Sequence, residues 1–196
     1  MNEAHEKHVQ FYLKHLAHLR TEDLAIVRAS LSIYELGKRE YFLEGGETQK
    51  ELGFVCKGLV RRYYINEKGN DITTGFIKET AYVTDYPAFI RQIPTKYYFQ
   101  CLEPTVIVTV PYEVIQESYE TFQNGQLYGR IMAERTLTTF NDRIESFLFL
   151  TAEERYLKFI SEHADLMNRV SLTHLSSFLG IERQSLSRIR KRISVK

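Results

Sequence analysis

Residues 170–196 read VSLTHLSSFLGIERQSLSRIRKRISVK, and this stretch decides the organisation of the chain. Ser171 precedes a short run with apolar residues at helical spacing, Gly180 ends that run, and a second amphipathic run begins near Arg183. A capping serine, a glycine turn and a second short helix are typical of a helix-turn-helix. The positions expected to face inward are Leu172, Leu175, Phe178, Leu179, Ile181, Leu186, Ile189 and Ile193.

The same end of the chain carries most of the excess positive charge. From Arg169 to Lys196 there are seven Lys or Arg residues against one acid, Glu182, so this segment is +6 although the whole chain is only +1. A basic module attached to an acidic body is typical of nucleic-acid-binding proteins.

The outward positions of the second helix predict how DNA would be read. Arg can hold guanine, and Gln can hold adenine, with two hydrogen bonds each. We therefore expect Arg183, Gln184 and Arg188 to read base edges. The residues expected to contact phosphates are Ser171, Thr173, Ser185, Ser187 and Lys191. A basic amphipathic helix on its own could also be a solvated face, but here it occurs together with the short helix and the glycine turn.

The first part of the chain predicts a β domain preceded by two helices. Residues 8–20 have helical spacing, and Thr21 before two acids predicts the cap of a second helix. From Ser32 to Val110, short runs rich in aromatic and β-branched residues are separated by glycines and turn residues. Within it, RRYYIN, EKGN and DITTGFI, residues 61–77, predict a hairpin with Gly69 at a positive φ.

After Pro111 the pattern predicts a long helix. A stripe at alternating spacings of three and four is formed by Arg130, Ala133, Leu137, Phe140, Ile144 and Phe147, and all of these residues except Arg130 are apolar. The stripe could pack on the β domain, but its length favours contact with a second copy of the chain, so we expect a homodimer. Thr151 and Glu154 then form the pattern of a capping box, which starts a helix extending to about Asp165.

These segments carry a resemblance to a known family. GKREYFLEGGE, FVCKGLVRRYYINEKGN and GFIKETAYVTDYPAF, beginning at residues 37, 54 and 75, follow the strand order of the Crp/Fnr family of bacterial regulators. Residues 182–188, ERQSLSR, resemble the family motif SRETVGR in its recognition helix, with both arginines retained at Arg183 and Arg188. Gln184 stands where that motif has Glu, which predicts a preference for adenine in place of cytosine.

The resemblance implies an α+β fold. Its parts would be an N-terminal β-roll of the cyclic-nucleotide-binding type with flanking helices over residues 1–111, a dimerisation helix region over 112–150 and a DNA-binding domain over 151–196. It also implies a transcriptional regulator that binds double-stranded DNA as a homodimer, with RNA polymerase as a further candidate partner. The alternative is a ligand-sensing or interaction protein of the same fold without specific DNA binding.

The sequence departs from the family at the ligand position. Thr84-Asp85-Tyr86 and Thr95-Lys96-Tyr97 replace the Gly-Glu-Leu segment and the arginine pair that hold a cyclic nucleotide. A lysine lacks the two-pronged geometry of arginine, so cyclic AMP is not expected as a cofactor. The roll could still hold an unidentified small effector, or none. The candidate pocket residues are Asp85, Tyr86, Thr95, Lys96 and Tyr97.

A second departure lies at the C-terminal end. Only Ser194, Val195 and Lys196 follow Ile193, so we expect a helix-turn-helix without the usual β-hairpin wing. Contacts to phosphate would then come from Arg190, Lys191, Arg192 and Lys196.

Several other classes of function are not expected. Cys56 and Cys101 are isolated, which argues against a disulfide framework or a zinc site and indicates a reducing cytoplasm. Four histidines, His5, His8, His15 and His18, have spacings that suit one helix face, but suitable partner ligands are missing, so no metal is expected. The sequence contains no nucleophile elbow, phosphate loop or HExxH motif, so an enzyme is not expected.

Overall fold

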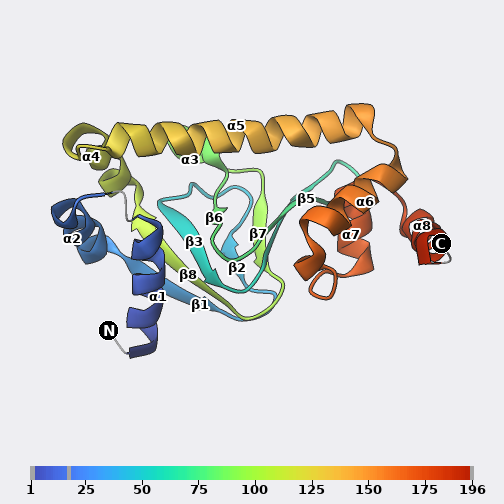
Figure 1. Ribbon diagram of the computed structural model, residues 1–196, viewed down its shortest axis with the longest axis horizontal. Helices are drawn as coiled ribbons and strands as arrows, with labels where there is room; N and C mark the ends of the chain where they lie inside the picture. The colour runs from blue at the N-terminus through green and yellow to red at the C-terminus, as the bar shows by residue number, and fades with distance from the viewer. Residues whose placement is uncertain (1–2, 17–18, 195–196) are drawn as a thin grey trace. The chain divides into compact units, whose positions relative to one another are not determined.

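The computed structural model describes residues 3–16 and 19–194 (Figure 1). Two helices come first, followed by a β domain with one internal helix, and a helical part completes the chain. The helices are α1 Glu3–His15, α2 Thr21–Ser30, α3 Tyr86–Arg91, α4 Tyr112–Thr121, α5 Gly125–Phe149, α6 Ala152–Glu162, the 3-10 helix Ala164–Leu166, α7 Leu172–Leu179 and α8 Arg183–Ser194. The strands are β1 Ser32–Leu36, β2 Tyr41–Leu43, β3 Glu51–Lys57, β4 Val60–Ile65, β5 Asp71–Ile77, β6 Tyr82–Val83, β7 Tyr98–Cys101 and β8 Thr105–Pro111.

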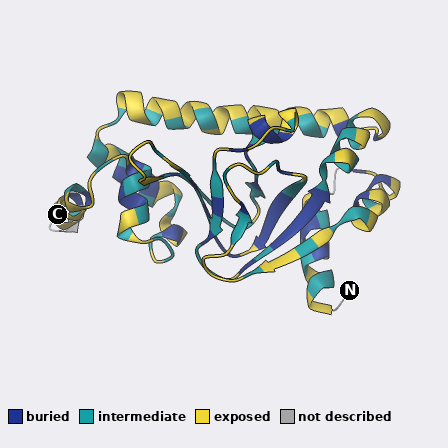
Figure 2. Ribbon diagram, turned by 180° about the vertical axis from the view of Figure 1, so that it is seen from behind, coloured by how far each residue is buried: buried dark blue, intermediate teal, exposed yellow. Residues whose placement is uncertain are grey.

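The β domain is a roll of two four-stranded sheets, with strand orders β1-β8-β3-β6 and β2-β7-β4-β5. Successive side chains of a strand point to opposite faces, and β3 follows this rule. Val55 belongs to the core cluster that both sheets contribute to, whereas Phe54 and Cys56 belong to the cluster that also contains α1 and α2. Strands β3 and β8 are largely buried, whereas β1 is largely exposed (Figure 2). The expected α+β fold and β-roll are confirmed.

The N-terminal helices differ in detail from the prediction. Helix α1 begins and ends earlier than residues 8–20. Thr21 is the first residue of α2, not its cap, so that expectation is wrong. Arg20 precedes the helix and donates hydrogen bonds of 3.2 and 3.3 Å to the carboxylate of Asp23. Asp23, in the first turn of α2, thus binds the side chain of Arg20, which precedes the helix. The expected cap by the Thr21 side chain does not form.

The segment after Pro111 contains two helices, α4 and α5, because the helical conformation is interrupted at Phe122. This residue has extended backbone angles, φ −81° and ψ 135°, and its buried ring joins the core cluster beneath α1 and α2. The apolar stripe then falls on α5, where the expected long helix is confirmed. Much of α5 is exposed (Figure 2), most clearly at Leu137, Leu148 and Phe149, which are 71%, 70% and 74% exposed.

Tyrosine hydroxyls connect three elements of the first part of the chain. Tyr82 of β6 and Tyr128 of α5 hydrogen-bond to each other, and Tyr82 also hydrogen-bonds to Tyr12 of α1. Burial raises the pKa of all three groups above the ordinary value for tyrosine. These hydroxyls therefore stay protonated, and each can donate within the cluster.

The backbone packs into two compact units. The first comprises residues 1–62 and 76–135, and the second comprises 63–75 and 136–196. The boundary falls inside α5, and the tip of the β4–β5 hairpin belongs to the second unit. The expected division at residues 111 and 150 stays a prediction. None of the helices in the described part of the chain has the length and apolar character needed to cross a membrane.

Candidate nucleic-acid interface

The two helices and the turn predicted from residues 170–196 are present. Ser171 caps α7, since its hydroxyl accepts a hydrogen bond of 3.1 Å from the backbone N–H of His174. Gly180 ends α7 in the left-handed region, at φ 67° and ψ 36°. Helix α8 then starts at Arg183. The expected cap, turn and second helix are confirmed.

The inner faces of both helices form a small core in the second compact unit. Leu175 and Leu179 of α7 and Leu186 of α8 are each at most 2% exposed, and Ile189 is 8% exposed. Phe178 packs against Phe159 of α6, with ring centroids 5.5 Å apart. Because one face of α8 is fixed in this way, the opposite face is held outward.

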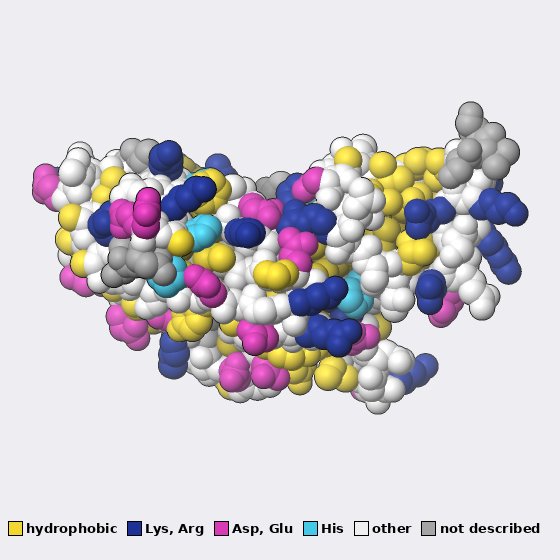
Figure 3. All heavy atoms as spheres, turned by 90° about the horizontal axis from the view of Figure 1, so that it is seen from below, with side chains coloured by type: hydrophobic (Ala, Val, Ile, Leu, Met, Phe, Trp, Pro, Cys, Tyr) yellow, Lys and Arg dark blue, Asp and Glu magenta, His cyan; other side chains and the backbone are white. Residues whose placement is uncertain are grey.

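The outward face of α8 is cationic. Its exposed residues are Arg183, Gln184, Ser187, Arg188, Arg190, Lys191 and Arg192, and Ser185 is half-buried. Figure 3 shows dark blue Lys and Arg side chains around α8. The three residues predicted to read bases, Arg183, Gln184 and Arg188, thus share an accessible surface, and their role stays a prediction.

Arg183 has an unfavourable position for helix stability. It is the first residue of α8, and the first turn of this helix contains no acid. The N-terminus of a helix carries partial positive charge, so a cation there opposes helix formation. Residues that break a local rule without a visible structural gain are often functional. The same charge is useful where a helix N-terminus meets the electronegative groove of DNA.

Some predicted phosphate contacts already have partners within the chain. Ser187 donates a hydrogen bond of 3.1 Å to the carbonyl of Arg183, and Ser171 is used by the cap. Arg192 forms an ion pair with Glu153 of α6. Thr173 and Lys191 are exposed. Val195 and Lys196 lie outside the described residues, so the expectation about the wing stays a prediction.

A contact with the β4–β5 hairpin was not foreseen from sequence. The hydroxyl of Ser177, on α7, accepts a hydrogen bond of 2.9 Å from the backbone N–H of Thr73 and lies 3.3 Å from the carbonyl of Asp71, to which it donates. The hairpin itself is as predicted, with Gly69 at φ 77°. The partners are more than 100 residues apart, so no local pattern could have indicated the contact.

The turn glycine offers a matched test. A Cβ at Gly180 would lie 2.7 Å from Cε1 of Phe147, whereas a Cβ at Gly69 meets nothing within 4 Å, although both residues have similar positive φ. The backbone strain of alanine costs about 1–2 kcal/mol at either position. Overpacking adds about 1–3 kcal/mol at Gly180 only. In urea unfolding, Gly180→Ala should therefore lose clearly more stability than Gly69→Ala, and equal losses would contradict this.

In the roll, three of the predicted pocket residues come together. The hydroxyl of Thr95 donates a hydrogen bond of 2.7 Å to the carboxylate of Asp85, and both residues are buried. The backbone N–H of Tyr97 donates to the same hydroxyl at 3.0 Å. Tyr86 turns toward α4, where its hydroxyl hydrogen-bonds to Tyr119.

Two cations approach the ring of Tyr97. Nζ of Lys96 lies 5.3 Å from the ring centroid of Tyr97, and Cζ of Arg62, on β4, lies 5.2 Å from it. Burial lowers the pKa of the Arg62 guanidinium, while Tyr97 and Asp85 favour its charged form. The sequence indicated that residues 95–97 lack the arginine of the family, but it did not indicate Arg62, because this residue belongs to a strand more than 30 positions earlier. The feature of the sequence that could have pointed to Arg62 is the alternating strand pattern around Arg61 and Arg62.

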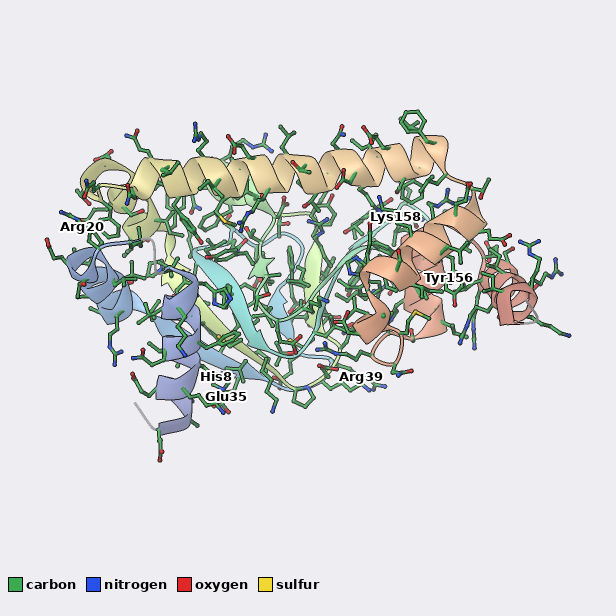
Figure 4. The ribbon with its side chains drawn as sticks, in the orientation of Figure 1. His8, Arg20, Glu35, Arg39, Tyr156 and Lys158 are labelled. Atoms are coloured by element: carbon green, nitrogen blue, oxygen red, sulfur yellow. The ribbon has the colours of Figure 1, made fainter. Side chains whose placement is uncertain are left out.

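The N-terminal histidines have local partners. Nε2 of His5 lies 2.7 Å from a carboxylate oxygen of Glu35, and Nδ1 of His15 lies 2.9 Å from the carbonyl oxygen of Phe11. His8 is near Glu35 (Figure 4), but burial dominates and lowers its pKa. Within residues 3–16 and 19–194, no group of three or more His, Cys, Asp or Glu is placed to hold a metal ion, and His18 lies outside the described residues.

The chain is similar to several known proteins. Residues 34–122 match the family described as the cyclic nucleotide-binding domain. FixK2 from Bradyrhizobium japonicum has 15% identity and a TM-score of 0.74, with 84% of this chain and 85% of that chain covered. The c-di-GMP-responsive global regulator CLP of Xanthomonas campestris has 17% identity and a TM-score of 0.68, with 90% and 92% covered.

A protein from Eubacterium rectale that is described as a putative transcriptional regulator of the Crp/Fnr family has 16% identity and a TM-score of 0.72, with 92% of this chain and 86% of that chain covered. No curated protein sequence is significantly similar to this chain. Residues 34–122 thus form a cyclic nucleotide-binding-type domain. The chain as a whole has the fold of the Crp/Fnr regulators.

Proposed function

We propose that this protein is a DNA-binding transcriptional regulator of the Crp/Fnr type. The observation that carries the proposal is the accessible cationic face of α8, held outward by buried Leu186 and Ile189 next to the capped helix α7. Arg183, Gln184 and Arg188 read base edges in the major groove, while Ser171, Thr173, Ser185, Ser187 and Lys191 contact the backbone. No enzymatic step is part of this proposal.

The proposed active form is a homodimer joined along α5. Leu137, Ile144 and Leu148 are 58–71% exposed and follow one another at spacings of seven and four residues. Such an apolar stripe on an exposed helix is suited to a second copy of the same helix. In a twofold-symmetric dimer, two α8 helices would enter successive turns of the major groove, about 34 Å apart. RNA polymerase remains a candidate partner.

We propose two alternatives for the roll: it senses a small effector, or it binds none. A small effector would contact the cluster around Tyr97, where Arg62 and Lys96 offer positive charge and Asp85 offers negative charge. Alternatively, the roll binds no effector, since Asp85 and Thr95 already satisfy each other. Cyclic AMP is disfavoured, because the arginine that would hold its phosphate is absent from residues 95–97.

A selection experiment tests the proposal. The purified full-length chain is incubated with a library of randomised 30-base-pair duplexes at low salt, and bound duplexes are amplified and sequenced. We expect enrichment of an inverted repeat with half-sites one helical turn apart. A folded protein that enriches no sequence would contradict specific DNA binding and favour an interaction protein of the same fold.

A further inference from the structure

Two arginines hold the C-terminal end of α7, the first helix of the helix-turn-helix. Arg143 of α5 donates to the carbonyl of Phe178, and Arg155 of α6 donates through Nε to the carbonyl of Leu179 at 3.1 Å. The last carbonyls of a helix have no partner within the helix, and they carry partial negative charge. Both arginines therefore stabilise the end of α7, next to the Gly180 turn.

The same arginines stack on aromatic rings. The guanidinium of Arg143 lies 4.4 Å from the ring centroid of Phe147 and 3.9 Å from that of Phe178, and Arg155 lies 4.8 Å from that of Phe147. Planar guanidinium groups bind ring faces well, and lysine does not reproduce this geometry. We call these four residues, Arg143, Phe147, Arg155 and Phe178, the clamp.

The clamp spans the connection between α5 and α6. Arg155 also donates a hydrogen bond of 2.7 Å to the carbonyl of Leu150, which lies between these helices. The capping box of Thr151 and Glu154 fixes the start of α6 at the same place. Consistent with these contacts, residues 136–149 of α5 belong to the same compact unit as α6, α7 and α8.

We propose that the clamp makes the C-terminal half of α5 and the helix-turn-helix one rigid reading unit, with Arg143 and Arg155 as positioning residues that set the half-site spacing. This inference rests on the proposed function, because the spacing has meaning only for a dimer on DNA. The apolar stripe of α5 that we propose as the dimer seam is formed by Leu137, Ile144 and Leu148. It lies on the same compact unit as Arg183 and Arg188. Rotation about Leu150 would move the recognition helix relative to the seam, and the clamp opposes that rotation.

The first test needs no DNA. Spin labels are attached in the full-length chain at Glu145→Cys and Glu182→Cys, which are exposed positions on α5 and just before α8. Cys56 and Cys101 are buried, and burial raises the pKa of Cys56 to about 12, so these thiols resist labelling. Labelled protein is diluted with excess unlabelled protein, so that pulsed EPR reports distances within one chain.

The clamp variant is Arg143→Met with Arg155→Met. The control, Lys158→Met, removes a cation from α6 (Figure 4), and the ion pair of this lysine among the described residues is with Glu162 at 3.8 Å. We expect one narrow distance distribution in the parent and control proteins, and at least a twofold broader one in the clamp variant. If the double variant does not fold, Arg143→Lys decides, because it keeps the charge and loses the stack. An unchanged distribution in the folded variant would overturn the proposal.

The second test uses DNA. Once an operator is known, duplexes are prepared with spacers lengthened or shortened by one or two base pairs, together with a duplex that carries a single half-site. We expect the parent protein to prefer one spacing by at least tenfold. The clamp variant should accept the altered spacers within about threefold and retain its single-half-site affinity within about twofold.

The outcomes separate this inference from the proposed function. A variant that loses single-half-site affinity as strongly as operator affinity, with its spacing preference intact, would overturn the positioning role and leave a structural one. Absence of any DNA binding by the parent protein contradicts the proposed function, whereas the EPR measurement still decides whether the unit is rigid.

Discussion

Replacement of Arg183 and Arg188 together by alanine should lower the affinity for the selected operator by at least about 100-fold at fixed salt. A bidentate arginine–guanine pair contributes about 1–3 kcal/mol of discrimination, and each 1.4 kcal/mol is a factor of ten in affinity. Both side chains are exposed on α8, and Arg183 lies at the helix N-terminus, where loss of a cation does not weaken the helix. Fluorescence anisotropy with a labelled operator measures the change.

The control variant is Lys38→Ala with Arg91→Ala, which removes the same charge from exposed positions on the first compact unit. It should bind the operator within about threefold of the parent protein. Lys191→Ala should weaken binding to all sequences similarly and reduce the slope of affinity against salt by about one. Equal losses on operator and unrelated DNA in the double arginine variant would contradict the base-reading role.

The second large effect is expected at the proposed dimer seam. Leu137→Glu with Ile144→Glu should convert the dimer into a monomer of 23.1 kDa and lower operator affinity by at least about 100-fold. Burial of one such side chain is worth about 1.5–3 kcal/mol, and each substitution acts twice in a symmetric dimer. Glutamates facing each other also repel. A monomer binds each half-site alone, so the gain from linking two sites is lost.

Sedimentation velocity measures the assembly state, and anisotropy measures operator affinity. The matched control, Ile26→Glu with Ile93→Glu, changes isoleucines that are 49% and 40% exposed and lie outside α5. It should remain dimeric. A seam variant that still sediments as a dimer would place the interface elsewhere on the chain.

Local sequence features were predictable because their causes are local. The Ser171 cap, the turn at Gly180, the capping box of Thr151 and the hairpin turn at Gly69 each depend on residues within four positions of one another. Side-chain oxygens near free backbone N–H groups, and glycines at positive φ, leave few alternative conformations. The start of α2 was mispredicted, because Arg20 competes for the acidic first turn.

The apolar stripe on α5 was predicted in part. Its periodicity located the helix, and Leu137 and Ile144 are exposed as a seam requires. Phe147 has the same spacing, yet its ring contacts the guanidinium groups of Arg143 and Arg155 and lies beside the Gly180 turn, within its own compact unit. Spacing cannot distinguish an apolar residue that faces a second chain from one that faces a later part of the same chain.

By itself, the sequence determined the helix-turn-helix, the β domain, the long helix and the charge of the outward face of α8, since periodicity and composition encode them directly. The roll architecture followed from the resemblance to the Crp/Fnr family. Only the tertiary structure decided that Arg62 lies over Tyr97, that Ser177 bonds the β4–β5 hairpin and that Arg143 holds the end of α7. Each of these contacts joins residues at least 35 positions apart. Such pairings depend on how the elements pack, which no local pattern of residues specifies.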